Sequence, residues 1–264
     1  MSDFLKDMAE SSAARAAAAP SFTDADFDKP VVPLTLGAFD VIAEIKQRSP
    51  AEGQLTPKGT SYLLPALGSR AQAYAAGGAA AISVLTEPSR FDGELSHLEA
   101  VAAAVPGTPV MRKDFLVEPV QILEGRKAGA SGVLLIATML SDAKLRTMHD
   151  CAFEHGMFVL LETFDEDDLR RATKFLDGEG DLLIGVNTRN LRTLEVDTER
   201  LQKLAPLLPD AKCVAESGLR VAEDAARVMG WGYSMALVGT ALMRSEDPAA
   251  LVRAMREAGA TQCS

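Results

Sequence analysis

Six short apolar runs in this chain each end in a polar or ionisable residue, and this feature constrains the fold more than any other. Short continuous apolar runs, each followed by a helix-like stretch, are typical of buried parallel strands. The residues that follow the runs are Glu44 and Lys46, Arg112-Lys113-Asp114, Glu162, Asn187 and Arg189, Glu216-Ser217-Gly218, and Gly239-Thr240. Because the carboxyl ends of parallel strands share one face, we expect these groups to meet at one mouth, as in α/β-barrel active sites.

The spacing of the apolar runs predicts eight strand–helix units. We expect strands near residues 41–46, 80–85, 109–113, 132–136, 158–162, 182–186, 212–216 and 235–239. Helical periodicity is found over residues 62–76, 96–104, 119–128, 142–155, 165–176, 198–207 and 221–229. This α/β pattern predicts a closed (β/α)8 TIM barrel. The competing fold is an open doubly wound sheet, but the GxGxxG dinucleotide-binding motif is absent from the sequence.

The first forty residues read as an addition to the barrel. Residues 1–19 favour a helix that Pro20 ends, and residues 21–33 read as an extended connector. We therefore divide the 264 residues into an N-terminal helical extension and connector, residues 1–40, and a barrel catalytic domain, residues 41–264.

Charge and cysteine content narrow the classes of partner. The net charge of −10 argues against a nucleic-acid partner, since phosphate contacts need clustered Lys and Arg. The three cysteines, Cys151, Cys213 and Cys263, are widely spaced and form no metal-binding motif, which favours a reducing cytoplasm. The chain has no signal-like start and no apolar run long enough to span a membrane. We expect a soluble cytoplasmic enzyme, as a monomer or weak homo-oligomer, acting on a small molecule.

Two small-residue segments predict a phosphate site. Ser217-Gly218 and Gly239-Thr240 follow the seventh and eighth predicted strands, where many barrels bind a phosphate group. Small residues let backbone N–H groups approach the phosphate oxygens, and Arg189 could add a bidentate partner. The alternative, that both segments are simple turns, does not explain why they follow these two strands.

Lysines and glutamates at strand ends predict acid–base chemistry. Lys46 and Lys113 end the first and third strands, whereas Glu162 and Glu216 end the fifth and seventh. Cations and carboxylates around one cavity shift one another's pKa values, which lets a Lys act as an acid and a Glu as a base. The alternative is a structural ion-pair network at the rim. The acidic run 165–168 opens a predicted helix, where acids complement the helix dipole, so we expect no metal there.

The motifs at these strand ends resemble those of the indole-3-glycerol phosphate synthase family. Lys113-Asp114-Phe115 and Asn187-Thr188-Arg189-Asn190-Leu191 are distinctive, whereas Glu216-Ser217-Gly218 alone would be weak. The other matching segments are 43–50, 85–87 with Phe91 and Gly93, 133–136, Leu161-Glu162 and 237–239, all in family order. The resemblance covers residues 41 to 245.

This resemblance implies a decarboxylating ring closure in tryptophan biosynthesis. The substrate would be 1-(2-carboxyphenylamino)-1-deoxyribulose 5-phosphate, and the products would be indole-3-glycerol phosphate, carbon dioxide and water. Such a carboxy-lyase needs neither a metal nor a redox cofactor. A neutral ketone does need a proton donor within hydrogen-bond reach.

The resemblance also assigns roles to individual residues. Lys113 would be the general acid that polarises the ketone, and Glu162 the acid/base partner in the later dehydration. Lys46 would hold the substrate carboxylate and share the later proton transfers. Three residues would orient Lys46 and the sugar hydroxyls: Glu44, Asn187 and Glu216. Six residues would bind the phosphate: Ser49, Arg189, Ser217, Gly218, Gly239 and Thr240. The apolar pocket for the aromatic ring would consist of Phe91, Phe115 and Leu134.

Two segments depart from the family pattern. Ser49-Pro50-Ala51 stands where the family usually has Ser-Pro-Ser, and Thr163-Phe164 follows the fifth strand in place of the common Val-His or Ile-Asn. Neither change removes a proposed catalytic group, but both could tune substrate entry or specificity.

Three other functions compete. Phosphoribosylanthranilate isomerase is a related phosphate-binding barrel, but it needs an early Cys that the first strand lacks. A non-catalytic barrel that binds an anthranilate-like phosphate has no need of Lys46, Lys113 and Glu162 together. A relative that acts on a substituted anthranilate is distinguished by assays with substituted substrates.

Overall fold

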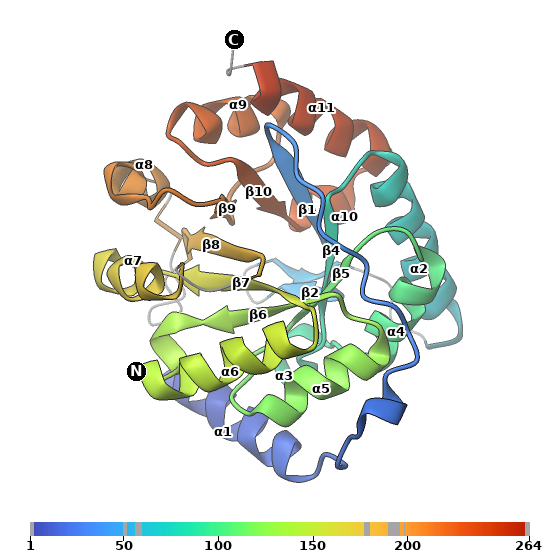
Figure 1. The fold of residues 1–264 in the computed structure, drawn as a ribbon. Helices are drawn as coiled ribbons and strands as arrows, with labels where there is room; N and C mark the ends of the chain where they lie inside the picture. Colours follow the sequence, from blue (N-terminus) through green and yellow to red (C-terminus); the bar gives the residue numbers. More distant parts are fainter. Residues whose placement is uncertain are drawn as a thin grey trace.

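A closed barrel of eight parallel strands forms the centre of the protein (Figure 1). The computed structural model describes residues 3–49, 52–55, 60–176, 180–189, 196–197 and 199–261. The strands are β1 (Asp40–Ile45), β4 (Ala81–Leu85), β5 (Val110–Lys113), β6 (Gly132–Ile136), β7 (Phe158–Thr163), β8 (Leu182–Asn187), β9 (Cys213–Glu216) and β10 (Met235–Val238). β1 pairs with both β4 and β10, which closes the ring. The predicted TIM barrel is confirmed.

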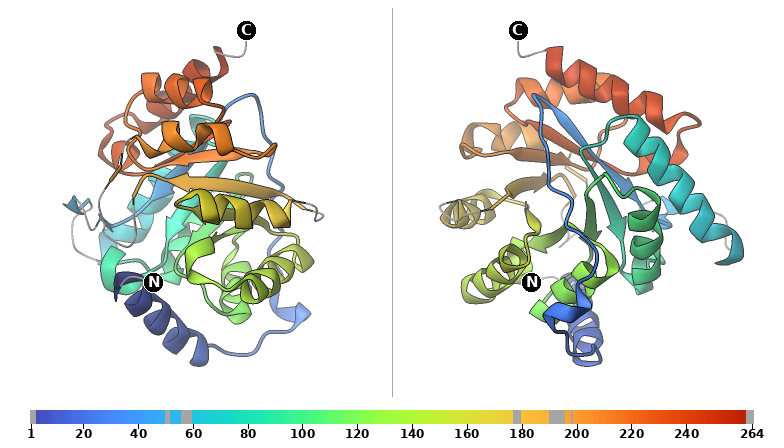
Figure 2. Two further views of the ribbon diagram at one scale, coloured as in Figure 1. Left: turned by 90° about the vertical axis from the view of Figure 1, so that its left-hand side faces the viewer. Right: turned by 45° about the vertical axis from the view of Figure 1, so that its right-hand side comes forward.

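Helices surround the barrel, as all three ribbon views show (Figures 1 and 2). They are α2 (Thr60–Ala76), α3 (Pro88–Phe91), α4 (Leu95–Ala104), α5 (Pro119–Ala128), α6 (Asp142–Glu154), α7 (Glu166–Ala172), α8 (Arg200–Leu204), α9 (Ala222–Gly230), α10 (Thr240–Arg244) and α11 (Pro248–Ala260). Short 3-10 turns follow β6, α7 and α8: η2 (Ala137–Met139), η3 (Thr173–Phe175) and η4 (Ala205–Leu207).

The alternation of side chains along each strand separates two layers of core. Val133 and Leu135 of β6 pack toward the helices, whereas Leu134 and Ile136 belong to the cluster inside the barrel. The same two-residue period places the polar groups. Each lies two positions beyond an apolar residue of the inner cluster: Ile42 before Glu44, Met111 before Lys113, Leu160 before Glu162, and Val214 before Glu216.

The N-terminal segment begins with α1 (Asp3–Ala17) and continues through a short turn, η1 (Asp24–Asp26), to β1. Figure 2 shows α1 lying outside the barrel, with the connector running along the molecule to the start of β1. Leu5 and Met8 of α1 are buried in the inner cluster, and Gln121 Nε2 of α5 donates a hydrogen bond to Ser12 Oγ at 2.8 Å. The division at residue 40 into extension and barrel domain stays a prediction.

Some elements differ from the sequence prediction. The helix predicted over residues 198–207 is interrupted, because Pro206 lacks the N–H that an α-helix interior needs, so α8 passes into η4. The short hairpin of β2 (Arg48–Ser49) and β3 (Gly53–Gln54) was not expected, nor were α3, α10 and α11. Pro50, Ala51, Asn190, Leu191 and Cys263 lie outside the described residues.

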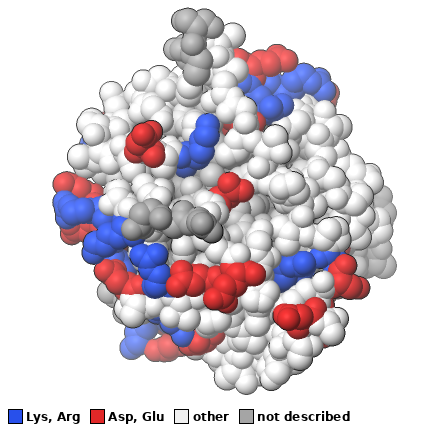
Figure 3. Space-filling model, viewed as in Figure 1, with Lys and Arg blue, Asp and Glu red and all other residues white. Residues whose placement is uncertain are grey.

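Charged side chains are mixed on the face turned to the viewer in Figure 3, where basic groups lie beside acidic ones. Elsewhere on the surface, Asp142 pairs with both Arg171 and Lys174. No helix in the part of the chain that the structure describes is both long enough and apolar enough to cross a membrane.

Candidate active site

A cavity of about 960 Å³ opens at the carboxyl ends of the strands. Fourteen of the fifteen residues that the sequence nominated line it, so groups from positions 44 to 240 do meet around one rim. They are Glu44, Lys46, Ser49, Phe91, Lys113, Phe115, Leu134, Glu162, Asn187, Arg189, Ser217, Gly218, Gly239 and Thr240. The fifteenth, Glu216, has no exposed surface and lies beneath this layer.

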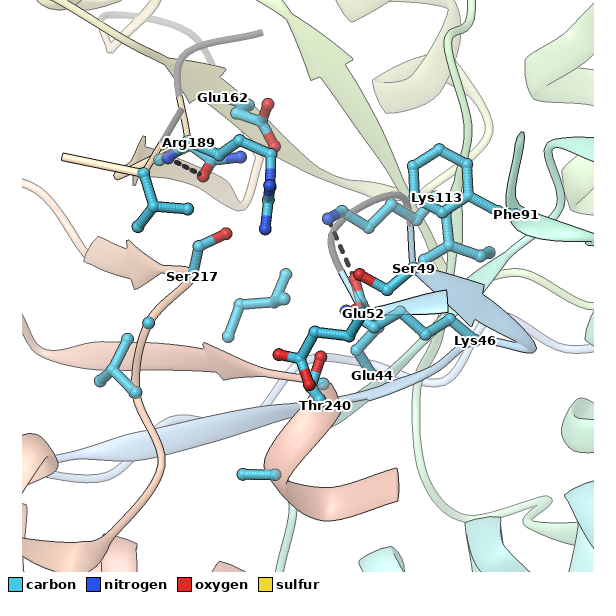
Figure 4. A pocket seen from close by; sticks show the side chains of 18 of the residues that line it. Glu44, Lys46, Ser49, Glu52, Phe91, Lys113, Glu162, Arg189, Ser217 and Thr240 are labelled. Atoms are coloured by element: carbon cyan, nitrogen blue, oxygen red, sulfur yellow. Dashed lines mark hydrogen bonds and ion pairs between the residues drawn. The ribbon is translucent and has the colours of Figure 1, made fainter. Parts of the chain in front are cut away.

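Two lysines share one carboxylate at the floor of the cavity. Lys46 Nζ lies 2.7 Å from Glu44 Oε1, and Lys113 Nζ lies 3.0 Å from Glu44 Oε2. Figure 4 shows both lysines and Glu162 pointing into the same space. Glu216 Oε2 lies 4.0 Å from Lys113 Nζ, so Lys113 of β5 contacts two carboxylates that come from β1 and β9, on either side of β10.

Burial and charge together set the protonation of this cluster. Burial disfavours the charged form of Glu44, but Lys113 and Lys46 outweigh it and hold the pKa of Glu44 at about 2. Burial likewise opposes the charge of Lys113, yet the nearby Glu44, Glu162 and Glu216 raise the pKa of this lysine above its ordinary value. Burial and the neighbouring Glu162 raise the pKa of Glu216 well above that of a free carboxyl group. Lys113 is therefore a protonated donor at neutral pH.

Five of the six residues nominated for the phosphate follow three neighbouring strands, β8, β9 and β10. Ser217 and Gly218 follow β9 with φ angles of 68° and 82°, a left-handed turn that is uncommon for a residue other than glycine. Gly239 and Thr240 follow β10, and Arg189 follows β8. Small side chains leave the backbone N–H groups of this rim accessible to an anion.

An apolar wall completes the cavity. The rings of Phe91 and Phe115 lie 6.1 Å apart, and Leu134 lies in the same buried cluster as Phe115. Phe4 of α1 also lines the cavity and meets Phe115 edge to face at 5.8 Å. Phe4 could not be predicted from the sequence, because the pattern of residues 1–19 does not indicate where their helix docks. An aromatic group bound here would therefore contact the N-terminal segment as well as the barrel.

Asp114 ties this wall to the neighbouring elements. Both of its oxygens accept hydrogen bonds from the guanidinium of Arg15 at 2.8 Å, which is a bidentate ion pair to α1. The hydroxyl of Thr86 and the backbone N–H of Phe115 each donate to Asp114 at 2.8 Å. Burial opposes the charge, but Arg15, Arg112 and Thr86 lower the pKa of Asp114. A fixed carboxylate thus holds the backbone between Lys113 and Phe115.

Three further charged residues that line the cavity were not predicted: Glu52, Arg220 and Arg244. Arg244 of α10 and Glu52 of the β2–β3 hairpin both line the cavity, and their charged groups lie 2.7 Å apart. Arg244 follows Thr240 by one helical turn, a spacing that could have nominated it. Glu52 lies in a hairpin that carries no strong strand signal.

Acidic residues outside the cavity have structural partners. Asp165 caps α7 by accepting the Asp168 N–H at 3.0 Å, and Asp168 accepts the hydroxyl of Thr138. Among the described residues, no three His, Cys, Asp or Glu side chains are placed to hold a metal ion.

Comparisons with known proteins point to one family. A family model described as indole-3-glycerol phosphate synthase matches residues 8–255. An indole-3-glycerol phosphate synthase from a Nocardioides species is 45% identical over 253 residues, which are 94% of this chain and 93% of the relative. One from Mycobacterium leprae is 43% identical over 247 residues, 93% of this chain and 85% of the relative.

Solved structures support the fold alone. The 3-hexulose-6-phosphate synthase of Salmonella typhimurium superposes with a TM-score of 0.64 at 15% identity, over 85% of this chain and 100% of that one.

Proposed function

The chain belongs to the indole-3-glycerol phosphate synthase family, and we propose that the cavity at its barrel mouth carries out that reaction. The carbon–carbon lyase converts 1-(2-carboxyphenylamino)-1-deoxyribulose 5-phosphate to indole-3-glycerol phosphate, carbon dioxide and water. One observation carries the proposal: two largely buried lysines share a carboxylate between an aromatic wall and a small-residue rim. This arrangement matches a substrate with an aromatic carboxylate at one end and a phosphate at the other.

The substrate lies across the cavity in this proposal. Its phosphate is held by Ser49, Arg189, Ser217, Gly218, Gly239 and Thr240. Its aromatic ring packs between Phe91, Phe115 and Leu134, beside Phe4. The phosphate is remote from the bond that forms, so its contacts position the substrate instead of lowering the barrier directly.

Lys113 is the general acid in this proposal. Its ammonium donates to the ketone oxygen as the aromatic carbon attacks the carbonyl carbon, and the carboxylate carbon then leaves as carbon dioxide. Lys46 holds the departing carboxylate, and Glu44 fixes both ammonium groups at 2.7 and 3.0 Å. A positioned donor of this kind contributes roughly 10² to 10⁴ in rate.

Loss of the hydroxyl as water then forms the double bond that makes the new ring aromatic. Glu162 lines the cavity and acts with Lys46 as the acid/base pair of this step. Asn187 accepts the backbone N–H of Arg189 at 2.9 Å, which orients it toward the sugar hydroxyls. Glu216 is fully buried, so it acts through Lys113 and Glu162. The overall reaction is redox-neutral, and the chemistry assigned here uses these side chains alone.

The direct test is to incubate the purified protein with the carboxyphenylamino sugar phosphate and follow indole fluorescence. Lys113→Ala should abolish turnover. It should keep its affinity for the phosphate group of the substrate, which is measured by letting a substrate-like phosphate ester compete for the site. Lys203→Ala is the control, since this lysine is 61% exposed on α8 and should keep wild-type turnover. Near-normal turnover by Lys113→Ala would make the acid assignment wrong.

Specificity and assembly are tested separately. If substrates with a substituted anthranilate ring are converted faster than the unsubstituted substrate, the protein is a specialised relative. If the protein isomerises phosphoribosylanthranilate, it is the competing barrel enzyme. We further propose that the protein is a monomer or weak homo-oligomer in the cytoplasm. Light scattering measures the oligomeric state, and cell fractionation measures the location.

A further inference from the structure

Gly185 faces the inside of the barrel at the middle of β8. Leu183, two residues before it, belongs to the inner cluster, and Asn187, two residues after it, lines the cavity. The strand period therefore points the missing side chain of Gly185 inward, one layer below Asn187. A Cβ atom at this position would overlap Glu216 Oε1 and lie 3.2 Å from Leu160 Cδ1.

The strand register explains why Glu216 occupies this space. Glu216 of β9 pairs with Asn187, whereas Gly185 pairs with Glu162 of β7 on its other side. The Glu216 side chain thus crosses β8 at the glycine and brings its carboxylate toward Glu162, with Lys113 Nζ at 4.0 Å. Any larger residue at 185 would stand between these two carboxyl groups.

Glu44 is placed in the same way, against a second glycine. Its strand, β1, neighbours β10, and Gly239 directly follows β10. A Cβ atom on Gly239 would overlap Glu44 Oε1 and lie 2.9 Å from Lys46 Nζ. Both carboxylates that flank Lys113 therefore lie against a glycine of an adjacent strand.

We propose that Gly185 is a positioning residue for the reaction, because its missing side chain is the space that holds the Glu216 carboxylate beside Lys113 and Glu162. This inference rests on the function proposed above. It adds a requirement that the charged residues alone do not reveal: the strand between Glu162 and Glu216 must carry no side chain at this point.

The test is a double-mutant cycle of Gly185→Ala and Glu216→Asp. Gly185→Ala should lower kcat by about 100-fold, the cost of displacing a catalytic group by about 1 Å. Glu216→Asp withdraws the carboxylate by one methylene, which leaves room for the new methyl group. In that background the added methyl should cost less than about tenfold, since the two changes share one contact. An equal cost in both backgrounds would overturn the proposal.

Gly132 provides the matched control. It also faces inward, in β6, and a Cβ atom there would overlap the ring of Phe158 and no charged group. Gly132→Ala should lower the melting temperature but keep kcat near wild type, and Glu216→Asp should not change its effect. Leu160→Val tests the second neighbour of Gly185. If Leu160→Val restores Gly185→Ala activity and Glu216→Asp does not, the glycine serves packing only and the proposal fails.

A crystal structure of Gly185→Ala separates this inference from the proposed function. A displaced Glu216 carboxylate supports the positioning role even if the wild-type protein forms no indole product, in which case the proposed function alone is wrong. An unmoved Glu216 overturns the positioning role, whatever the wild-type activity.

Discussion

Glu44→Gln should destabilise the folded protein in a manner that depends on pH. Gln keeps the size of the side chain but removes the negative charge that lies 2.7 Å from Lys46 and 3.0 Å from Lys113. Both ammonium groups are largely buried, with 15% and 16% of their side chains exposed, so water replaces little of the lost interaction.

The size of the effect follows from the pKa of Glu44. The pKa falls from an ordinary 4.5 to about 2, since the two lysines overcome the cost of burial. Each pKa unit is worth about 1.4 kcal/mol, so the charge of Glu44 contributes about 3 kcal/mol to the free energy of unfolding at pH 7. Because the folded pKa is lowered, this contribution is fully present above about pH 4.5 and is lost as the pH falls toward 2.

Urea unfolding of the wild type and of Glu44→Gln, at pH 7 and at pH 3, measures this contribution. The difference between the two proteins should be about 3 kcal/mol at pH 7 and roughly half of that at pH 3. Glu99→Gln, on the exposed side of α4, is the control and should change little. A difference below about 1 kcal/mol at pH 7, or one that is constant with pH, would refute the electrostatic reasoning.

Two further predictions concern the N-terminal helix and the cysteines. Arg15→Ala removes the ion pair to Asp114 and loosens α1. We expect KM to rise several-fold with a smaller change in kcat, because Phe4 contacts the bound ring equally in the ground state and the transition state. Steady-state kinetics measure both constants, with Arg15→Lys as the conservative control. Burial raises the pKa of the Cys213 thiol to about 12, so a thiol reagent at pH 8 should label it only after unfolding, which peptide mapping detects.

The barrel strands could be predicted because each is buried on both faces. Parallel strands covered by helices read as short apolar runs, and the predicted bounds agree with β1 and β4 to β10 within one or two residues. The charged residues that line the cavity at the strand ends could also be predicted from these apolar runs. A polar residue at the end of such a run must lie at the mouth, where Lys46, Lys113 and Glu162 line the cavity.

The remaining features depend on tertiary packing. Phe4 lines the cavity because α1 is docked by the Arg15–Asp114 ion pair, the Ser12–Gln121 hydrogen bond and the burial of Leu5 and Met8. Glu216 was expected at the mouth with its neighbours, yet it lies beneath them because Gly185 leaves room for its side chain. The helix α11 could have been found, since Val252, Met255 and Gly259 are buried at a helical spacing.

The cavity can form only when synthesis of the polypeptide is nearly complete, because β1 pairs with β10, the last strand of the barrel. Asp40 pairs with Met235, so one edge of β1 has no partner strand until residue 235 has been synthesised. Lys46 and Glu44 extend from that first strand, and Gly239 follows the last one. A nascent chain that stalls before residue 235 thus carries most of the reactive side chains without the enclosure that would bring them together.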